Sequence, residues 1–305
     1  MISVIIPAYN SEKTIARCLQ SLLDQEYDGE YEIILVDGSV DRTPEIVRER
    51  FPTVRYFRID GMSDPGAKRN LGIREAKGDP LLFIDSDCVA EPDWMRRMVE
   101  QHAVHPDVAA VGGAAYNGND PGCGVAWAGY MGEFREFIPE NPEGYVDHIP
   151  TLNISYKRWV FERHGFFESR YFPQEDLIFN YNLRRKGERI LFHPGIRVHH
   201  THRTELHSFL AHQRKIGKIT SLTLREFPFK GARLVRNRLL FVLVGPIIPV
   251  AKSINTLKVF ITRNPRILLR YPRAFLIFNI GLIYWFWGFC AGVFARNLPE
   301  DWALR

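Results

Sequence analysis

The chain has 305 residues, of which 46% are hydrophobic and 13% aromatic, so a disordered chain is excluded. Its length suffices for one large domain and an additional segment. Residues 1–200 carry 23 basic and 31 acidic side chains, whereas residues 201–305 carry 17 basic and 4 acidic ones. This asymmetry excludes a uniformly basic nucleic-acid-binding protein. It indicates instead that the second part meets an anionic membrane surface.

The four cysteines lie far apart, at Cys18, Cys88, Cys123 and Cys290. They form no C-x-x-C pair, so neither a structural zinc site nor a disulfide framework is predicted, and a reducing compartment fits. The chain opens on MISVIIPAYN, which lacks the basic segment and the longer apolar run of a secretory signal.

Short apolar runs in the first half predict strands. They are Ile2–Ile6, Glu32–Val36, Val54–Ile59, Leu81–Ile84 and a shorter run at Ala109–Val111. Near-continuous apolar runs are typical of strands buried on both faces of a parallel sheet.

Helical patterns lie between these runs. Ser11–Leu23 has apolar residues at helical spacing, with Ser11 as the expected cap, and Thr43-Pro44-Glu45 begins a second helix. Ala67–Ala76 is the third. This alternation predicts an α/β fold with a doubly wound, mostly parallel sheet, in which ligands bind beyond the carboxyl ends of the strands.

The second part predicts a basic, apolar helical tail associated with a membrane. Leu239–Ala251 is uncharged but is interrupted by Gly245-Pro246 and Pro249, so we expect it to dip into the membrane or lie in the interface. Ala274–Ala295 has 22 uncharged residues and is long enough to span, although the sequence leaves open whether it crosses or returns. The alternative is a core helix of a soluble domain. We predict a catalytic domain over residues 1–222 and the tail over 223–305.

Six basic residues lie between the two apolar stretches: Lys252, Lys258, Arg263, Arg266, Arg270 and Arg273. Positive charge next to a membrane segment predicts that this stretch and the catalytic domain are on the cytoplasmic side of the cell membrane.

The strongest chemical signal is Asp85-Ser86-Asp87, directly after the run LLFI. Two carboxylates so close together at a strand end repel one another unless a cation or strong donors lie between them. Hard divalent cations take carboxylate oxygens and share their coordination with phosphates. Asp85 and Asp87 therefore predict a Mg²⁺ or Mn²⁺ site.

Other strand ends carry residues suited to a nucleotide. Asp37 can accept hydrogen bonds from a base or a ribose, whereas Asp41 is better explained as a helix cap. Pro7 and Tyr9 can line the pocket with backbone and ring. The helix start at Gly66–Asn70 offers amides, and Arg69 offers a guanidinium, to a diphosphate.

A pair of carboxylates, Glu175 and Asp176, opens a later helix. One of them can be a general base whose pKa is raised by its neighbour, or both can be charges that favour the helix N-terminus. Six histidines follow within 20 residues: His193, His199, His200, His202, His207 and His212. Without an H-E-x-x-H pattern a dedicated zinc site is not predicted, but His199 or His200 can join the carboxylates on a metal.

These motifs together resemble family 2 glycosyltransferases of the GT-A fold over about residues 1–200. The matching stretches are VIIPAYNSEKTIARCLQSLLDQ, EIILVDGSVDRTPEIV, GAKRNLGIREAKGDPLLFIDSDC and NISYKRWVFERHGFFESRYFPQEDLIFNYNLRRKG. The resemblance implies a nucleotide-diphosphate-sugar donor, a divalent metal and an inverting transfer. The segment VDGSVDRT is one residue shorter than the usual family pattern.

The resemblance also implies residue roles. Asp37 matches the aspartate that recognises the base, and Arg69 the arginine that binds the donor. Asp85 and Asp87 match the D-x-D motif, with Asp87 the more direct metal ligand. Asp176 matches the catalytic base.

Two further roles come from the segment after these motifs. His200 matches the histidine often found after the E-D motif. His212-Gln213-Arg214-Lys215 stands near the place of the Q-x-x-R-W motif of processive synthases, with Arg214 expected at the donor, but it lacks the tryptophan. Transfer of a single sugar is therefore favoured over polymerisation.

The expected function is transfer of a sugar to a hydroxyl of a lipid-linked or glycan acceptor, guided by the aromatic segment 122–145. The first alternative is a polyprenyl-phosphate sugar synthase, whose phosphate acceptor needs no base. A nucleotidyltransferase would carry a glycine-rich basic loop after the first strand, which Pro7–Lys13 is not. A non-catalytic membrane scaffold is a further alternative, but the presence of Asp85, Asp87 and Asp176 in one chain argues against it.

Overall fold

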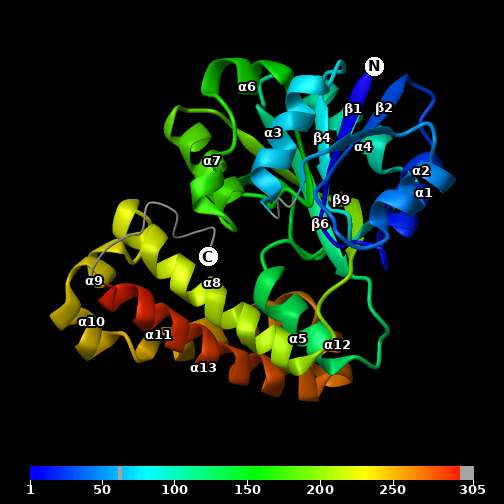
Figure 1. Cartoon of the computed structure of the whole chain (residues 1–305). Helices are drawn as coiled ribbons and strands as arrows, with labels where there is room; N and C mark the ends of the chain where they lie inside the picture. Colours follow the sequence, from blue (N-terminus) through cyan, green and yellow to red (C-terminus); the bar gives the residue numbers. More distant parts are fainter. Residues whose placement is uncertain (61–63, 296–305) are drawn as a thin grey trace. The chain divides into compact units, whose positions relative to one another are not determined.

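The computed structural model describes residues 1–60 and 64–295 (Figure 1). The chain divides into two compact units. Unit 1 consists of Met1–Gly118 and Phe137–Thr201, and unit 2 consists of Asn119–Glu136 and the chain from His202 onward. The chain therefore enters unit 2 twice, first with a short internal segment and then with its C-terminal third.

Unit 1 is built on one mixed sheet with the strand order β3-β2-β1-β4-β8-β6-β9-β5, and β7 pairs with β9 beside this path. The strands are β1 (Ile2–Ala8), β2 (Tyr31–Asp37), β3 (Arg55–Arg58), β4 (Leu81–Ile84), β5 (Cys88–Ala90), β6 (Ala110–Asn117), β7 (Gly144–Val146), β8 (Asn153–Tyr156) and β9 (Ile190–His200).

The first four strands of this order are parallel, as the apolar runs predict. β1 and β4 are fully buried, which explains why their sequences do not alternate between apolar and polar residues. β8 then pairs antiparallel with both β4 and β6, and β6 pairs parallel with β9. Because β1, β2 and β4 run in one direction, their carboxyl ends lie along one edge of the sheet.

The helices of unit 1 cover this sheet. They are α1 (Ile15–Leu23), α2 (Thr43–Arg50), α3 (Pro65–Glu75), α4 (Trp94–Val104), α6 (Arg158–His164), the 3₁₀ helix η1 (Ser169–Tyr171) and α7 (Glu175–Arg185). Asp41 accepts hydrogen bonds from the Thr43 amide at 3.0 Å and its hydroxyl at 2.6 Å, so it holds the first residue of α2. It is not the cap of this helix, because the N-cap position belongs to Arg42, which makes no side-chain cap bond.

The predicted cap of α1 is wrong. The helix begins at Ile15, and its N-cap residue Thr14 makes no side-chain cap bond. Ser11 lies one turn earlier, and its hydroxyl is 2.7 Å from the hydroxyl of Ser86. Ser11 thus ties the turn after β1 to the middle of the Asp85–Asp87 motif instead of starting a helix.

Unit 2 is helical. Its helices are α5 (Gly124–Glu133), α8 (Leu206–Glu226), α9 (Ala232–Arg236), α10 (Arg238–Val244), α11 (Ile247–Arg263), α12 (Pro265–Arg270) and α13 (Pro272–Phe294). The predicted break at Gly245-Pro246 separates α10 from α11, which are bent by 56°. Among the described residues, α13 is the one helix long and apolar enough by itself to cross a membrane, and the bent α10–α11 pair is a second candidate if it counts as one span.

Helices α8 and α13 pack at very short distance because glycines line their contact. A Cβ atom added at Gly217 would lie 1.8 Å from the carbonyl oxygen of Trp285, and one added at Gly288 would lie 1.9 Å from that of Arg214. The predicted domain boundary after residue 222 falls inside α8, whereas the compact units separate between Thr201 and His202. The whole helix belongs to unit 2 because its apolar side packs on α13.

Candidate active site

The ends of three parallel strands place the candidate residues of unit 1. β1 ends at Ala8, which is opposite Asp37 at the end of β2, and Asp85 directly follows β4. After β1 the chain turns sharply at Asn10, whose φ of 52° lies in the left-handed region that asparagine tolerates. The Asn10 side chain accepts a hydrogen bond from the Val40 amide at 3.0 Å, so the turns after β1 and β2 are joined.

Asp37 is completely buried and strongly held. Its carboxylate accepts hydrogen bonds from the Ser39 amide and the Tyr56 hydroxyl, both at 2.8 Å, and lies 3.6 Å from the Arg58 guanidinium. Sequence reasoning did not identify Tyr56 and Arg58. Their position on β3, whose Arg58 is opposite Asp37, is the feature that brings them to the site.

Lys68 on α3 is a further residue of this part of unit 1. It is buried, its ammonium donates a hydrogen bond to the Ala8 carbonyl at 2.8 Å, and it lies 5.0 Å from the centre of the Tyr9 ring. The pKa of Lys68 is lowered to about 8 because burial disfavours its charged form. The negative charge of Asp37 partly opposes this effect. A buried cation therefore stands at the end of β1, between Pro7–Tyr9 and Asp37.

The amides at the start of α3 are not available in the predicted way. Asp64 caps this helix and accepts hydrogen bonds from the amides of Gly66 at 2.9 Å and Ala67 at 3.1 Å. The prediction that these amides bind a diphosphate is wrong, because an aspartate from the same turn already satisfies them.

Arg69 joins the two acidic motifs. Its guanidinium donates to Asp85 Oδ1 at 2.7 Å and to Glu175 Oε1 at 2.9 Å, and Arg69 and Glu175 are both almost fully buried. The two carboxylates come from residues 90 positions apart in the sequence. The arginine thus fixes the start of α7 against the end of β4.

The pKa of the Glu175 carboxyl is raised to about 8. Burial is the main cause and the charge of Asp176 adds to it, while Arg69 opposes both effects. The pKa of Asp85 is also raised by burial and by Asp87, and again Arg69 opposes the shift. The predicted raised pKa in the Glu175–Asp176 pair therefore occurs at Glu175, with desolvation as the main cause.

Asp176 is the more accessible member of this pair. Its Oδ2 accepts hydrogen bonds from the Thr151 amide at 3.1 Å and the Thr151 hydroxyl at 3.3 Å. Thr151 just precedes β8, so the antiparallel strand at the centre of the sheet orients Asp176. Sequence reasoning missed Thr151, and no local pattern identifies it.

The antiparallel pair β5–β9 decides between the two histidines. Cys88 is opposite His200, so His200 lies beside the Asp85–Asp87 motif, and its Nε2 is 3.5 Å from Asp87 Oδ2. His199 points to a different partner, with its Nε2 2.6 Å from Glu91 Oε1. His200 is therefore the histidine that stands with the carboxylates.

The residues present fit a divalent cation that shares its ligands with a substrate. Within residues 1–60 and 64–295, no group of three histidine, cysteine, aspartate or glutamate side chains is arranged to hold a metal ion alone. Asp87, Asp85 and His200 nevertheless combine hard carboxylate oxygens with an imidazole, and Asp85 Oδ1 is already bound by Arg69. Such a partial donor set is typical of sites in which water and phosphate oxygens complete the coordination of the cation.

The other residues named from the sequence lie elsewhere. His202 and His212 lie 3.7 and 3.4 Å from the Glu133 carboxylate, and His193 lies 3.6 Å from Glu143, so the histidines form no single cluster. Arg214 belongs to unit 2, where its guanidinium lies 3.8 Å from the centre of the Trp287 ring. The four cysteines are free.

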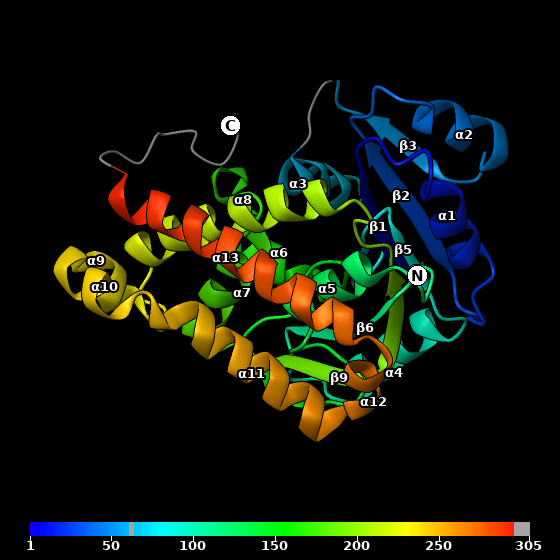
Figure 2. The same ribbon diagram turned by 90° about the horizontal axis from the view of Figure 1, so that it is seen from below.

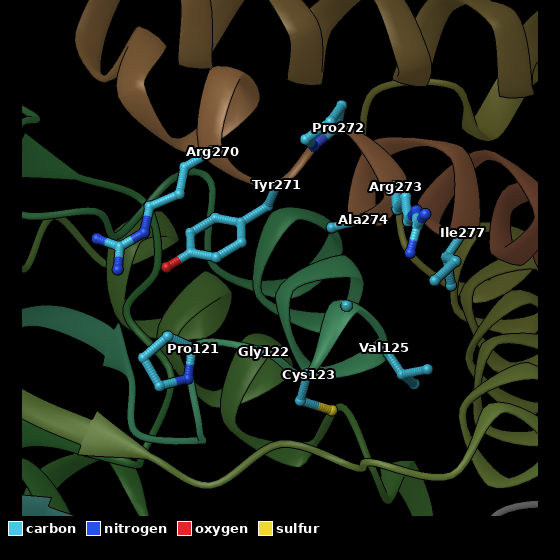
Figure 3. A pocket seen from close by; sticks show the side chains of 11 residues that line it. Pro121, Gly122, Cys123, Val125, Arg270, Tyr271, Pro272, Arg273, Ala274 and Ile277 are labelled. Atoms are coloured by element: carbon cyan, nitrogen blue, oxygen red, sulfur yellow. The ribbon is translucent and has the colours of Figure 1, made fainter.

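The aromatic segment of unit 2 borders a cavity of about 710 Å³ between the start of α5 and the turn from α12 to α13 (Figure 3). Its lining residues include Pro121, Cys123, Arg270, Tyr271 and Arg273. The Tyr271 ring stacks on Trp127 at 4.1 Å. Tyr130 and Phe134 are buried, so these two rings of the segment serve mainly in packing.

Comparison with known proteins gives the family. The sequence model of the family described as Glycosyl transferase family 2 matches residues 3–164, which is more than half of the chain and includes Asp37, Arg69, Asp85 and Asp87. The chain belongs to glycosyl transferase family 2. It is therefore a glycosyltransferase, as the sequence motifs indicate.

Individual relatives differ in how much of their length the chain covers. It is 23% identical to the dolichyl N-acetyl-alpha-D-glucosaminyl phosphate 3-beta-D-2,3-diacetamido-2,3-dideoxy-beta-D-glucuronosyltransferase of Methanococcus voltae, over 97% of this chain and 98% of that protein. It is 28% identical to chondroitin synthase of Escherichia coli, over 61% of this chain but only 32% of that protein.

Solved structures show the same fold. The mannosyltransferase PcManGT from Pyrobaculum calidifontis, determined in complex with GDP-Man and Mn²⁺, aligns with a TM-score of 0.62 at 17% identity over 97% of this chain and 88% of that one. Residues 1–349 of S. aureus TarS align with a TM-score of 0.51 at 20% identity, over 92% and 89% of the two chains. The predicted GT-A fold is thereby confirmed.

Glu175→Gln should weaken the dependence of the free energy of unfolding on pH. The pKa of Glu175 is about 8 in the folded chain against an ordinary value of 4.5, so between these values the folded chain binds more protons than the unfolded one. Its contribution to stability therefore falls as pH rises through this window. Glutamine does not titrate, so the variant should lose less stability than the parent in urea titrations at increasing pH.

The matched control is Glu168→Gln, which replaces an exposed glutamate of unit 1. The free energy of unfolding of this variant should depend on pH as that of the parent does. Parallel stability curves for the parent and Glu175→Gln across the window would contradict the raised pKa.

Proposed function

We propose that the protein is an inverting glycosyltransferase that moves a sugar from a nucleotide-diphosphate sugar to a hydroxyl of a lipid-linked or glycan acceptor. The observation that carries the proposal is the Arg69 bridge between Asp85 and Glu175. This bridge holds the Asp85–Asp87 motif and the Glu175–Asp176 pair of α7 next to one another. Both lie beside the strand end that carries Asp37.

The donor would bind along the carboxyl ends of β1, β2 and β4. Asp37, held by Tyr56 and the Ser39 amide, accepts hydrogen bonds from the nucleoside, next to Pro7 and Tyr9. Lys68 and Arg69 supply positive charge toward the diphosphate. Complexes of the structural neighbours with GDP-Man or UDP-GlcNAc support a nucleotide-sugar donor.

Asp87, Asp85 and His200 would hold a Mg²⁺ or Mn²⁺ ion, which supplies charge neutralisation for the leaving diphosphate when bound. The Mn²⁺ complex of PcManGT supports a divalent cation. His200 contributes an imidazole next to Asp87, and Arg69 keeps Asp85 in a fixed orientation. These residues prepare the site before the donor arrives.

Asp176 is the proposed general base. The acceptor oxygen forms a bond to the anomeric carbon on the face opposite the diphosphate, the bond from that carbon to the diphosphate breaks, and the hydroxyl proton passes to Asp176. Thr151 orients the carboxylate through two hydrogen bonds to Oδ2. Glu175 is a positioning residue, because the hydrogen bond from Arg69 occupies one of its oxygens.

The acceptor is proposed to be lipid-linked. The Methanococcus voltae relative, aligned over nearly its whole length, is named for a dolichyl-linked sugar phosphate. The alternative, a polyprenyl-phosphate acceptor, would make a base unnecessary. The oriented, accessible carboxylate of Asp176 favours the hydroxyl acceptor.

We further propose that the enzyme is bound to the cytoplasmic face of the cell membrane through unit 2. Exposed large apolar side chains gather on α10, α11 and α13, and basic residues lie between them in the sequence. Apolar exposure on this scale marks an interaction surface, and positive charge beside it fits the anionic cytoplasmic leaflet.

Asp87→Ala should reduce turnover by several orders of magnitude and abolish the part of donor binding that depends on the divalent cation. Donor hydrolysis and transfer, measured with Mn²⁺ or Mg²⁺ across a set of nucleotide sugars, check this. Asp107→Ala removes an exposed aspartate of the same unit and should leave both quantities unchanged. Full activity of the parent in excess chelator would contradict the metal assignment.

Asp176→Asn should preserve donor affinity but lower turnover by about 10²–10⁴-fold, the usual contribution of a general base. Calorimetry with the donor and a product assay separate these two effects. Asp147→Asn, at an exposed aspartate of unit 1, is the control. Normal turnover of Asp176→Asn would favour the phosphate acceptor instead.

The full chain should sediment with membranes after a high-salt wash and should enter the soluble fraction only with detergent. Salt screens the contacts of basic residues with headgroups but leaves the buried apolar area intact. Release by salt alone, or recovery in the soluble fraction from the start, would contradict attachment through the apolar helices.

A further inference from the structure

We propose that unit 2 binds one leaflet of an anionic bilayer with α13 lying in the plane of the interface, so that this helix does not cross the membrane although its length would allow it. The inference rests on the proposed membrane attachment and not on the proposed chemistry. It follows from what covers each side of α13.

One side of α13 is packed against other helices along its length. In its first half, Ile277 and Phe278 lie against Gly124 and Gly132 of α5. In its second half, α8 runs beside it in the same direction, from the contact of Phe209 with Gly281 to the hydrogen bonds of Arg225 with the carbonyls of Gly292 and Ala295. Figure 1 shows α5 and α8 along this helix within unit 2.

The opposite side of α13 is apolar and open. Its exposed large side chains are Leu276, Ile280, Ile283, Trp287 and Phe294. At about 3.6 residues per turn these positions lie on the side opposite the buried Phe278, Gly281, Trp285, Gly288 and Gly292. The helix is therefore two-sided in burial, with one face for protein and one for an apolar partner.

Helices α10 and α11 also expose apolar side chains. Figure 2 shows α10, α11 and α13 together in one view of unit 2, and the Ser253 hydroxyl of α11 donates to the Asn279 side chain of α13 at 2.6 Å. The exposed apolar side chains of the two helices recur at helical spacing. They are Leu239, Val242 and Leu243 on α10, and Ile247, Val250, Ile254 and Ile261 on α11.

The decisive constraint is the charge on α8. The groove between α8 and α13 has a volume of about 630 Å³, and His207, Arg214, Lys215 and Lys218 line it from α8, opposite Tyr284 and Trp287. All four side chains are exposed, and Arg214, Lys215 and Lys218 are the cations among them. If α13 crossed the bilayer, α8 would accompany it, because the glycine contacts hold the two helices together, and its cations would reach the depth of the hydrocarbon.

Exposed cations are strongly disfavoured at that depth, whereas they are favourable among anionic headgroups. Further cations stand at the other end of α13, where Arg270 and Arg273 flank Tyr271 (Figure 3). Cationic and aromatic side chains therefore accompany both halves of α13. An in-plane helix places all of them near the headgroups and the open apolar face in the acyl boundary.

The location of the C-terminus tests the inference in the intact chain. A fusion of green fluorescent protein after Arg305 should fluoresce, and a fusion of alkaline phosphatase at the same place should be inactive. Both results are expected because an in-plane α13 leaves the C-terminus on the same side of the membrane as the N-terminus. An active phosphatase fusion in the membrane fraction would overturn the proposal.

Vesicle binding tests the contact with headgroups. Lys215→Gln with Lys218→Gln should lower partitioning into vesicles that contain anionic phosphatidylglycerol by about 30-fold, at the usual contribution of each basic residue near such a surface. Partitioning into phosphatidylcholine vesicles should change little. The matched control, Arg185→Gln with Lys186→Gln, removes two exposed cations from unit 1 and should change neither.

Equal partitioning of the parent and the α8 variant into anionic vesicles would overturn the contact of α8 with headgroups. A chain found in the soluble fraction would instead refute the membrane attachment itself. A parent chain that binds vesicles in the plane of the membrane but transfers no sugar would refute only the proposed chemistry. The failures of the α8 contact, of the membrane attachment and of the chemistry can therefore be told apart.

Discussion

The buried guanidinium of Arg69 is the point on which the arrangement of the site depends. It lies between Asp85 and Glu175, which come from separate parts of the chain, and each of the three would carry a large desolvation cost alone. Removing one partner of such a buried pair costs about 3–5 kcal/mol, yet an apolar replacement of the whole set is often neutral for stability. The bridge is therefore better explained by the positions it imposes than by the stability it adds.

The strand order makes this bridge possible. Parallel pairing of β1, β2 and β4 collects Asp37 and Asp85 at one edge, and the antiparallel β8 in the middle of the sheet places Thr151 where it orients Asp176. A second antiparallel pair, β5 with β9, returns the chain so that His200 lies next to Asp87. The mixed sheet thus brings together residues from five separate segments of the chain.

Much of this was predictable because the signals are local. The strand-end positions of Asp37 and Asp85 follow from the apolar runs before them, and the break between α10 and α11 follows from Gly245-Pro246. The choice of His200 over His199 was not predictable, since it depends on the register of two strands more than 100 residues apart.

Local signals also misled where tertiary contacts decided the outcome. Ser11 has the composition of a helix cap, but its hydroxyl bonds to Ser86 instead. The amides at the start of α3 suit a phosphate, but Asp64 occupies them. The burial of Lys68 was likewise invisible, because a lysine in a helix gives no sequence sign of a carbonyl partner on a distant strand.

The double visit of the chain to unit 2 has a consequence for its biosynthesis. Helix α5 ends at Glu133, whereas its partner α13 begins at Pro272, so about 140 further residues must be made before the two can pack. At about 5–20 residues per second this is a delay of roughly 7 to 30 s. During that interval unit 1 can complete its sheet, while the side of α5 that later meets α13 lacks this cover. A newly made chain therefore carries an uncovered helix until its last segment emerges from the ribosome.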